Sequence, residues 1–174
     1  MKGIKYLIVL LFTCTLCLQS CYNFTGAALT HGEATIQIRD FLNNTAYNPQ
    51  LAQQFSIAIQ NRFLQRTTLK GTTENPDMLI EGEITDYSIT PTTITTPTSG
   101  ANNNIIQSAQ SKLTITVKVH YENKKDPESS FDRSFSDEVT FDSGMDINQI
   151  ESTQVPVVND RIINKIFNDI VAKW

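Results

Sequence analysis

The stretch that decides the fold is LTITVKVHY, residues 113–121, in which large apolar side chains alternate with polar ones. Successive side chains of a β-strand point to opposite faces, so this period of two predicts a strand with one buried face and one face in water. Polar residues and a proline at positions 123–127 predict a turn. Even spacing of apolar side chains then resumes at Phe131, Phe135 and Phe141. The two segments predict an antiparallel hairpin.

Two other segments have apolar residues at the three- and four-residue spacing of an amphipathic helix. The first begins at Asn48 and Pro49, which are typical of a helix start, and extends over roughly 18 residues. The second lies near the end of the chain, where Asp146 and Gln149 resemble a capping box and Pro156 starts or kinks the main helix. Its polar face holds as many acids as bases, so packing against the core is favoured over binding at a membrane interface.

Two further strands precede the hairpin, over residues 34–41 and 78–90. The second has apolar residues on both faces, which indicates an interior strand or a bulge near Gly82. The resulting order β, α, β, β, β, α predicts an α+β fold, a two-layer sandwich with two helices packed on one face of a mixed four-stranded sheet. Residues 91–110 are rich in Thr, Asn and Ser and predict a long loop. A plain linker and a partner-binding loop are both open interpretations of it.

The N-terminus has the pattern of a secretory signal. Lys2 and Lys5 precede an uncharged apolar run over residues 7–18, which is shorter than the roughly 20 residues that span a bilayer as a helix. The run ends in Leu18-Gln19-Ser20-Cys21, which resembles the lipobox of bacterial lipoproteins. We therefore expect cleavage before Cys21 and acylation of its thiol.

This pattern divides the chain into a signal peptide at residues 1–20, a tether at 21–33 and a single domain at 34–174 that includes the long loop. The mature chain then keeps one cysteine, so it forms no disulfide within itself. Two alternatives stay open: a plain secreted protein with a free thiol, and a eukaryotic secreted protein that uses the sequons at Asn23 and Asn43.

Charge excludes one class of partner. The chain has 14 basic and 18 acidic side chains, and removal of residues 1–20 takes away two lysines and no acid. The mature balance of 12 to 18 gives a formal net charge of −6. We therefore expect no nucleic-acid partner, and an anionic ligand would have to be met by a local cluster of cations.

No pattern of residues indicates catalysis. The two histidines, His31 and His120, have no Cys, His, Asp or Glu at metal-ligand spacing, and no phosphate-binding or nucleophile motif is present. Glu81 and Glu83 lie on one strand face, where solvation is the simpler interpretation than paired acid and base. We expect no catalytic residue, no metal site and no cofactor.

Three segments together resemble one family: CYNFTGA at 21–27, MLIEGEITDY at 78–87 and KLTITVKV at 112–119. They are similar to the LptE-type lipopolysaccharide-assembly lipoproteins of Bacteroidota. The resemblance implies a two-helix, four-stranded sandwich held on the periplasmic side of the outer membrane by acyl chains, palmitate among them.

The resemblance also implies the partners. Members plug the LptD β-barrel, assist its assembly and bind lipopolysaccharide, with no catalytic residue or cofactor. Basic side chains at a sheet tip are implicated in lipopolysaccharide binding, and Lys112 is our candidate, a solvated lysine being the alternative. A generic periplasmic lipoprotein that binds a small apolar ligand, or stabilises another envelope complex, is the competing hypothesis.

Overall fold

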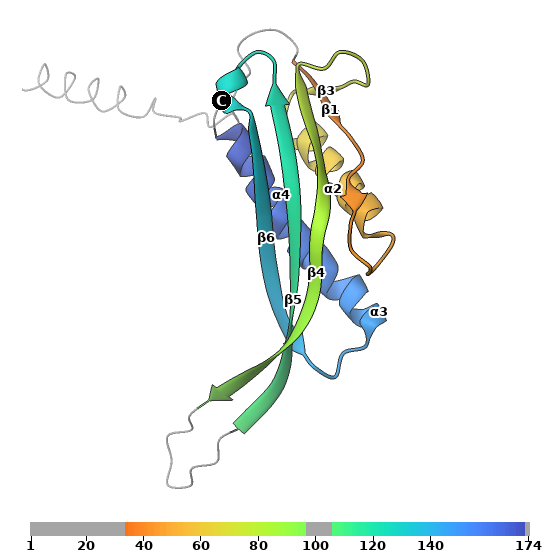
Figure 1. Ribbon diagram of the computed structural model, residues 1–174, viewed down its shortest axis with the longest axis vertical. Helices are drawn as coiled ribbons and strands as arrows, with labels where there is room; N and C mark the ends of the chain where they lie inside the picture. Colours follow the sequence, from red (N-terminus) through yellow and green to blue (C-terminus); the bar gives the residue numbers. More distant parts are fainter. Residues whose placement is uncertain (1–33, 97–105, 173–174) are drawn as a thin grey trace, which may run out of the picture.

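The computed structural model describes residues 34–96 and 106–172. It is an α+β sandwich in which two long helices lie against one face of a twisted mixed sheet (Figure 1). Three short helical segments complete it. In chain order the elements are β1 (Thr35–Ile38), β2 (Leu42–Asn43), α2 (Leu51–Arg66), β3 (Lys70–Gly71), β4 (Met78–Thr96), β5 (Ile106–Asn123), η2 (Pro127–Ser129), β6 (Phe131–Asp142), α3 (Ile147–Gln149), η3 (Ile150–Gln154) and α4 (Val155–Val171).

The sheet order is β3-β1-β4-β5-β6, and β2 pairs with β4 beside β1. β1 is parallel to both β3 and β4, so the chain makes a parallel crossover between β1 and β4 through α2. β4, β5 and β6 form an antiparallel meander, and the register joins Val117 of β5 to Phe135 of β6. The predicted hairpin is therefore confirmed, and the sheet is mixed as expected.

The core lies between the sheet and the two long helices. The odd-numbered apolar residues from Leu113 to Tyr121 on β5 are fully buried, as their alternation predicted. α2 contributes Phe55 and Phe63. α4 contributes four buried isoleucines, at positions 162, 163, 166 and 170. The rings of Phe63 and Phe167 meet edge to face at 5.1 Å between centroids, where the two helices contact each other.

Gly82 allows a close approach at the centre of β4. A Cβ atom there would lie 2.3 Å from the carbonyl oxygen of Lys118 and 2.6 Å from the ring of Phe41. Only a residue without a side chain fits between the neighbouring strand and this buried ring. The register shift of β4 lies between Ile84 and Asp86, two residues beyond the glycine near which the bulge was predicted.

The predicted strand count was wrong. Two strands of two residues each, β2 and β3, extend the sheet to six strands instead of four. Strands this short carry no detectable alternation, because one residue per face gives no period to recognise. Both use parallel pairing with longer strands, which depends on the tertiary fold.

The predicted loop at 91–110 was wrong over much of its length. β4 continues to Thr96 and β5 begins at Ile106, and the two pair without interruption from Pro91 opposite Ser111 to the end. The sequence of these residues is rich in Thr and Ser and has no alternating apolar side chains, so it shows no period of two. Thr is nevertheless a good strand former. Residues 97–105 lie outside the described part of the chain.

The helix starts are partly as predicted. Asp146 and Gln149 form the expected capping box, and Pro156 lies in the first turn of α4. α2 begins at Leu51, later than predicted, because Asn48 adopts a left-handed conformation (φ 41°) and its side chain accepts a hydrogen bond from the Gln50 N–H. This turn precedes the helix.

No helix in the described part of the chain is long and apolar enough to cross a membrane.

Candidate functional site

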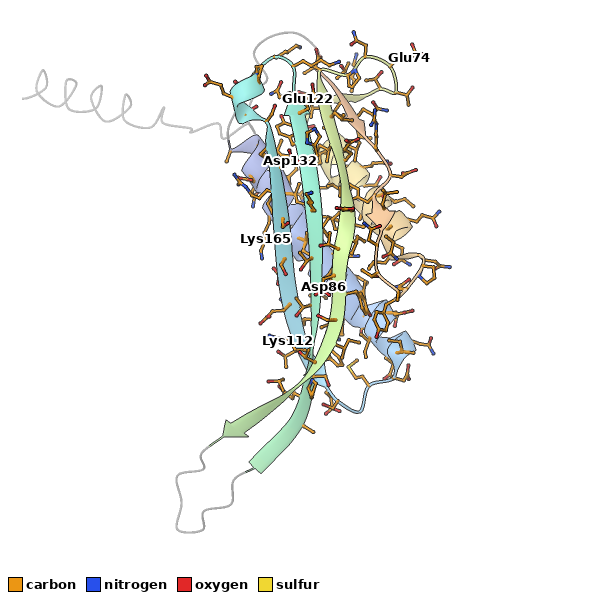
Figure 2. The ribbon with its side chains drawn as sticks, viewed as in Figure 1. Glu74, Asp86, Lys112, Glu122, Asp132 and Lys165 are labelled. Atoms are coloured by element: carbon orange, nitrogen blue, oxygen red, sulfur yellow. The ribbon has the colours of Figure 1, made fainter. Side chains whose placement is uncertain are left out.

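The candidate site is the face of the sheet that the helices leave uncovered, which we call the open face (Figure 2). It is formed by the polar residues that alternate with the buried ones on β4, β5 and β6. Cross-strand pairing arranges them in five rows: Glu81, His120 and Asp132; Glu83, Lys118 and Ser134; Asp86, Thr116 and Ser136; Ser88, Thr114 and Glu138; and Thr90, Lys112 and Thr140.

The open face is acidic overall. Its five rows carry five carboxylates and two lysines, with one histidine. Serine and threonine hydroxyl groups fill the remaining positions, and no large apolar side chain interrupts the rows. Such a surface is suited to water or to a polar partner, and it repels an anionic ligand except where a cation is close.

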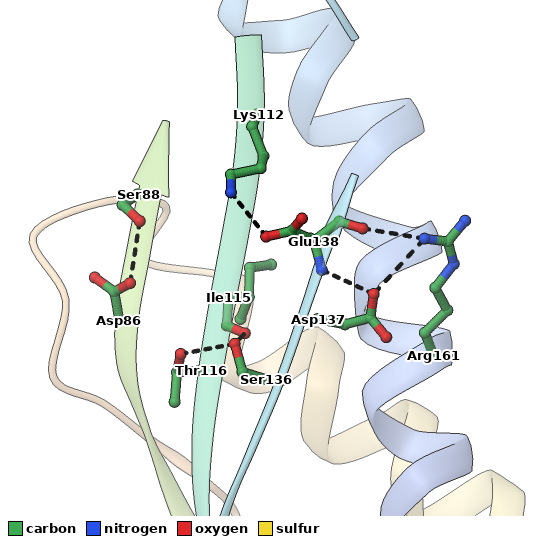
Figure 3. Close-up of polar contacts among 9 residues, drawn as sticks. All are labelled: Asp86, Ser88, Lys112, Ile115, Thr116, Ser136, Asp137, Glu138 and Arg161. Atoms are coloured by element: carbon green, nitrogen blue, oxygen red, sulfur yellow. Dashed lines mark hydrogen bonds and ion pairs between the residues drawn. The ribbon is translucent and has the colours of Figure 1, made fainter. Parts of the chain in front are cut away.

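The sequence-predicted residue Lys112 lies on this face, near the end of the domain from which β4 and β5 project. Its Nζ is 2.9 Å from a carboxylate oxygen of Glu138 on β6 (Figure 3). The pair is substantially exposed, with 36% and 58% of the two side chains accessible. The positive charge of Lys112 is therefore balanced by a neighbour that an anionic ligand would have to displace.

A groove of about 390 Å³ lies at the other end of the open face, beside β1. Its polar lining includes Arg39, Glu81, Lys118, His120 and Asp132. Arg39 pairs with Glu81 at 2.6 Å, and His120 Nδ1 lies 3.0 Å from Asp132. Lys118 forms no ion pair with any residue that the structure describes.

The alternation in residues 113–121 predicts a face in water that includes both His120 and Lys118, but nothing in the sequence distinguished Lys118 as a candidate. The alternation could have identified it only as an outward cation, because Lys118 occupies an outward position of the same stretch as Lys112. The sequence does not reveal that Lys112 has an ion pair and Lys118 has none among the described residues, because this depends on where Glu138 lies in the register of β6. Cys21, the predicted acylation site, lies outside the described residues.

On the helix side, α4 covers the edge strand β6 with cations. Lys165 Nζ lies 2.8 Å from Asp137 and donates to the carbonyl oxygen of Ser136. Arg161 donates to the carbonyl oxygen of Glu138 (Figure 3). Partial burial acts to raise the pKa of Asp137, but the hydrogen bonds from Lys165 and the Glu138 N–H outweigh it. The pKa therefore lies below its ordinary value.

A carboxylate also holds the start of β1 to the start of β4. Asp77 accepts hydrogen bonds from the backbone N–H and the hydroxyl of Thr35, at 2.9 and 3.0 Å, and pairs with Lys125. The backbone hydrogen bond from Thr35 is the main cause that lowers the pKa of Asp77, against a smaller opposing effect of burial. This contact fixes the first residues that the structure describes to the residue that precedes β4.

A second groove, of about 500 Å³, lies between α2 and the outer side of β1. Ile36, Ile38, Leu64 and Gln60 line it together with residues 71–73, and none of these side chains is charged. Leu64 is 46% exposed at its rim.

Within residues 34–96 and 106–172, no group of three or more His, Cys, Asp or Glu side chains is arranged to hold a metal ion.

Comparison with known proteins identifies the family. The family described as LptE, lipopolysaccharide-assembly, matches residues 34–173, which is most of the chain. No curated protein matches. Among solved structures, a hypothetical protein from Chlamydia trachomatis is similar with a TM-score of 0.52 and 12% identity, over 82% of this chain and 95% of that one.

Two lipoproteins of known structure are also similar. A minor lipoprotein from Acinetobacter baumannii aligns with a TM-score of 0.45 and 14% identity, over 81% of this chain and 94% of that one. Rare lipoprotein B from Shewanella oneidensis gives 0.44 and 8%, over 80% and 92%. Of these three, only the Chlamydia trachomatis structure, at a TM-score of 0.52, bears on the fold, and it bears on nothing else. The family match over residues 34–173 carries the assignment: the chain belongs to the LptE family of lipopolysaccharide-assembly lipoproteins.

Proposed function

We propose that this protein is a non-catalytic lipoprotein of the outer membrane that plugs and helps to assemble an LptD-type barrel and binds lipopolysaccharide. The family match supports the assembly role. The observation that carries the plug is the one-sided architecture: both long helices cover one face of the sheet, and the open face presents five rows of polar side chains. The interior of a large outer-membrane barrel is itself polar and hydrated, so a polar face is compatible with it.

Anchoring would come from Cys21. Acyl chains on this residue would hold the domain at the periplasmic side of the membrane, and multiple chains at about 0.8 kcal/mol per buried CH₂ make the anchor stable where one would be marginal. Intact-mass measurement of the mature protein tests this. An unmodified Cys21 thiol, or a mature chain that still carries residues 1–20, would refute the anchor.

Lipopolysaccharide carries phosphates, and the acidic open face offers them few cations. Lys112 is the candidate inherited from the sequence, and its pair with Glu138 means that binding there exchanges one anion for another. Lys118 is a second candidate, because its charge is not compensated by an ion pair in the described part of the chain. Both lie on β5 and face the same side of the sheet.

The decisive experiment has two readouts on the same set of variants, retention of the co-expressed barrel and binding of purified lipopolysaccharide. Lys112→Glu and Lys118→Glu each reverse one charge, and we expect reversal at a true site to weaken lipopolysaccharide binding about tenfold without loss of the barrel. The matched control is the double change Lys112→Glu with Glu138→Lys, which keeps the net charge and restores an ion pair.

The outcomes separate the components of the proposal. If a lysine reversal changes neither readout, that lysine is not a binding residue. If the wild-type protein retains no barrel and binds no lipopolysaccharide, the proposed function is wrong as a whole.

One observation favours a second candidate function, a carrier of a small apolar ligand. The groove between α2 and β1 is uncharged, has the volume of a site for such a ligand, and is lined in part by Ile36, Ile38 and Leu64. Native mass spectrometry and solvent extraction of the purified protein test it, with Leu64→Arg as the variant that should abolish retention. A ligand that stays bound in Leu64→Arg would exclude this groove as the site.

A further inference from the structure

The paired ends of β4 and β5 project past the helix layer as a two-stranded ribbon, which we define as residues 91–96 and 106–110 (Figure 1). β4 has 19 residues, so at roughly 3.3 Å per residue it is about 60 Å long, several times a typical strand. An isolated two-stranded hairpin is marginally stable in water. The six residues of β4 in the ribbon account for about 20 Å of this length, and we therefore ask what stabilises them.

The ribbon has no charged side chain. None occurs between Asp86 and Lys112, although 18% of the chain is charged and a stretch of this length would contain about four at that rate. Exposed strand edges are ordinarily guarded by charges, by bulges or by a covering element, because their free N–H and C=O groups pair with other strands. The edge of β6 is guarded in this way by Lys165 and Arg161.

The free edge of the ribbon follows from the register. The N–H of Ser143 donates to the carbonyl oxygen of Ala109 at 3.3 Å, so the backbone groups of Ala109 point away from β4. Thr93 lies directly opposite Ala109, and in an antiparallel pair both residues of such a position point outward. The backbone groups of Thr93 and Thr95 therefore face the outer edge of β4, where no strand of the described sheet pairs beyond Ile84.

Pro91 is consistent with this assignment. It shares the outward alternation of Thr93 and Thr95, so its missing N–H costs no hydrogen bond within the β4–β5 ladder. The other edge of the ribbon is shorter, because β6 pairs with β5 up to Gln110 and Ser143 occupies the carbonyl group of Ala109. Gln107 is the outward-facing position beyond them.

We propose that the outer edge of β4 in the ribbon is a docking site for an extended, uncharged segment of the barrel partner, which pairs with Thr93 and Thr95 as an added strand. The inference rests on the proposed function for the identity of the partner. Strands in the wall of a closed barrel have no free edge, so the added segment belongs to a loop or a domain outside the wall. A second copy of this chain is the weaker occupant, because two mature chains of net charge −6 repel each other.

The test is retention of the co-expressed barrel by the acylated full-length protein with the double change Thr93→Pro and Thr95→Pro. Both prolines remove outward N–H groups and leave the inner ladder intact, and their rings obstruct an added strand. We expect barrel retention to fall at least about tenfold, since two backbone hydrogen bonds are lost. Thr93→Val with Thr95→Val keeps both N–H groups, and Gln107→Pro removes a donor from the opposite edge; both controls should retain the barrel.

The outcomes distinguish the inference from the function. Undiminished retention by the double proline variant overturns the docking site and leaves the proposed function standing, whereas a wild-type protein that retains no barrel overturns both. Loss of retention with Gln107→Pro or with the valine pair shows that the edge of β4 is not what is recognised. Sedimentation that reveals a dimer dissolved by the proline pair assigns the edge to a second copy. The protein without its acyl chains is also tested for flotation with phosphatidylethanolamine vesicles. Flotation that the proline pair abolishes assigns the edge to the membrane. Either assignment, to a second copy or to the membrane, overturns the proposal.

Discussion

β4 and β5 pair along their whole length, yet they cross two different environments. In the central part of the sheet every second residue is a large apolar side chain that the helices bury, as from Leu113 to Tyr121. In the ribbon the same pairing continues with no helix above it and no charge along it. Backbone pairing alone therefore extends the strands, whereas burial of the alternating set anchors them. The difference separates a structural region of the sheet from a region available to a partner.

Hydrogen exchange should give the largest contrast between the two regions. Amides of Ile115, Val117 and Val119 lie in a strand paired on both sides, and they exchange only when the domain opens widely. Amides of the ribbon need only local fraying. We expect the central amides to be protected at least about a thousandfold more than those of residues 92–96 in the mature protein without its partner. Equal protection would mean that the ribbon is as firmly held as the core.

The contrast also explains which parts of the fold were predictable. Periods of two and of 3.6 arise from a buried face, so the central strands and both long helices could be read from the sequence. β2 and β3 are two residues long and pair with strands far along the chain, whereas the ribbon is a local hairpin whose sequence carries no periodic apolar set. On the open face, Lys112 was identifiable as an outward cation, but its pairing with Glu138 depends on the register of two strands.

Truncation of a central residue should destabilise the domain strongly. Ile115 is fully buried, so Ile115→Ala removes apolar contacts and leaves a cavity. We expect a loss of about 2–5 kcal/mol in the free energy of unfolding, measured by urea denaturation of the mature chain with Cys21→Ser. Thr114→Ala, one residue away on the open face, is the matched control and should change it by less than about 0.5 kcal/mol.

A single added methyl group should distinguish the centre of the sheet from its edge. Gly82→Ala places a Cβ atom 2.3 Å from the Lys118 carbonyl oxygen, and either the strands separate or Phe41 moves. We expect a loss of about 1–3 kcal/mol. At Gly71 on the edge strand β3 the nearest atom to an added Cβ is Leu64 Cδ2 at 3.5 Å, an ordinary contact, so Gly71→Ala should be tolerated. Similar losses at both positions would contradict the packing described here.

The stability of the domain should depend on the ionisation of Asp77. Its pKa in the folded state is below the ordinary value of 3.8, so the carboxylate stabilises the fold at pH above that value. This contribution is lost as the pH falls through the folded pKa. Urea midpoints followed from about pH 5 to about pH 2 should therefore decline less steeply for Asp77→Asn than for the wild type. Identical slopes would show that the contact with Thr35 makes no contribution.

The smallest effect is expected where the two regions meet, at Lys112 and Glu138. Both side chains are substantially exposed, and exposed pairs contribute about 0–1 kcal/mol because water screens them and their ordering costs side-chain entropy. Lys112→Ala and Glu138→Gln should each change the free energy of unfolding by less than about 1 kcal/mol, and the double variant should show little coupling between them. A larger loss would mean that the pair fixes the end of β6 against β5 and that Lys112 is a structural residue. A small loss means that the domain stays folded without the pair. A change in lipopolysaccharide binding by Lys112→Glu then reflects the reversed surface charge, because the stability of the fold is nearly unchanged.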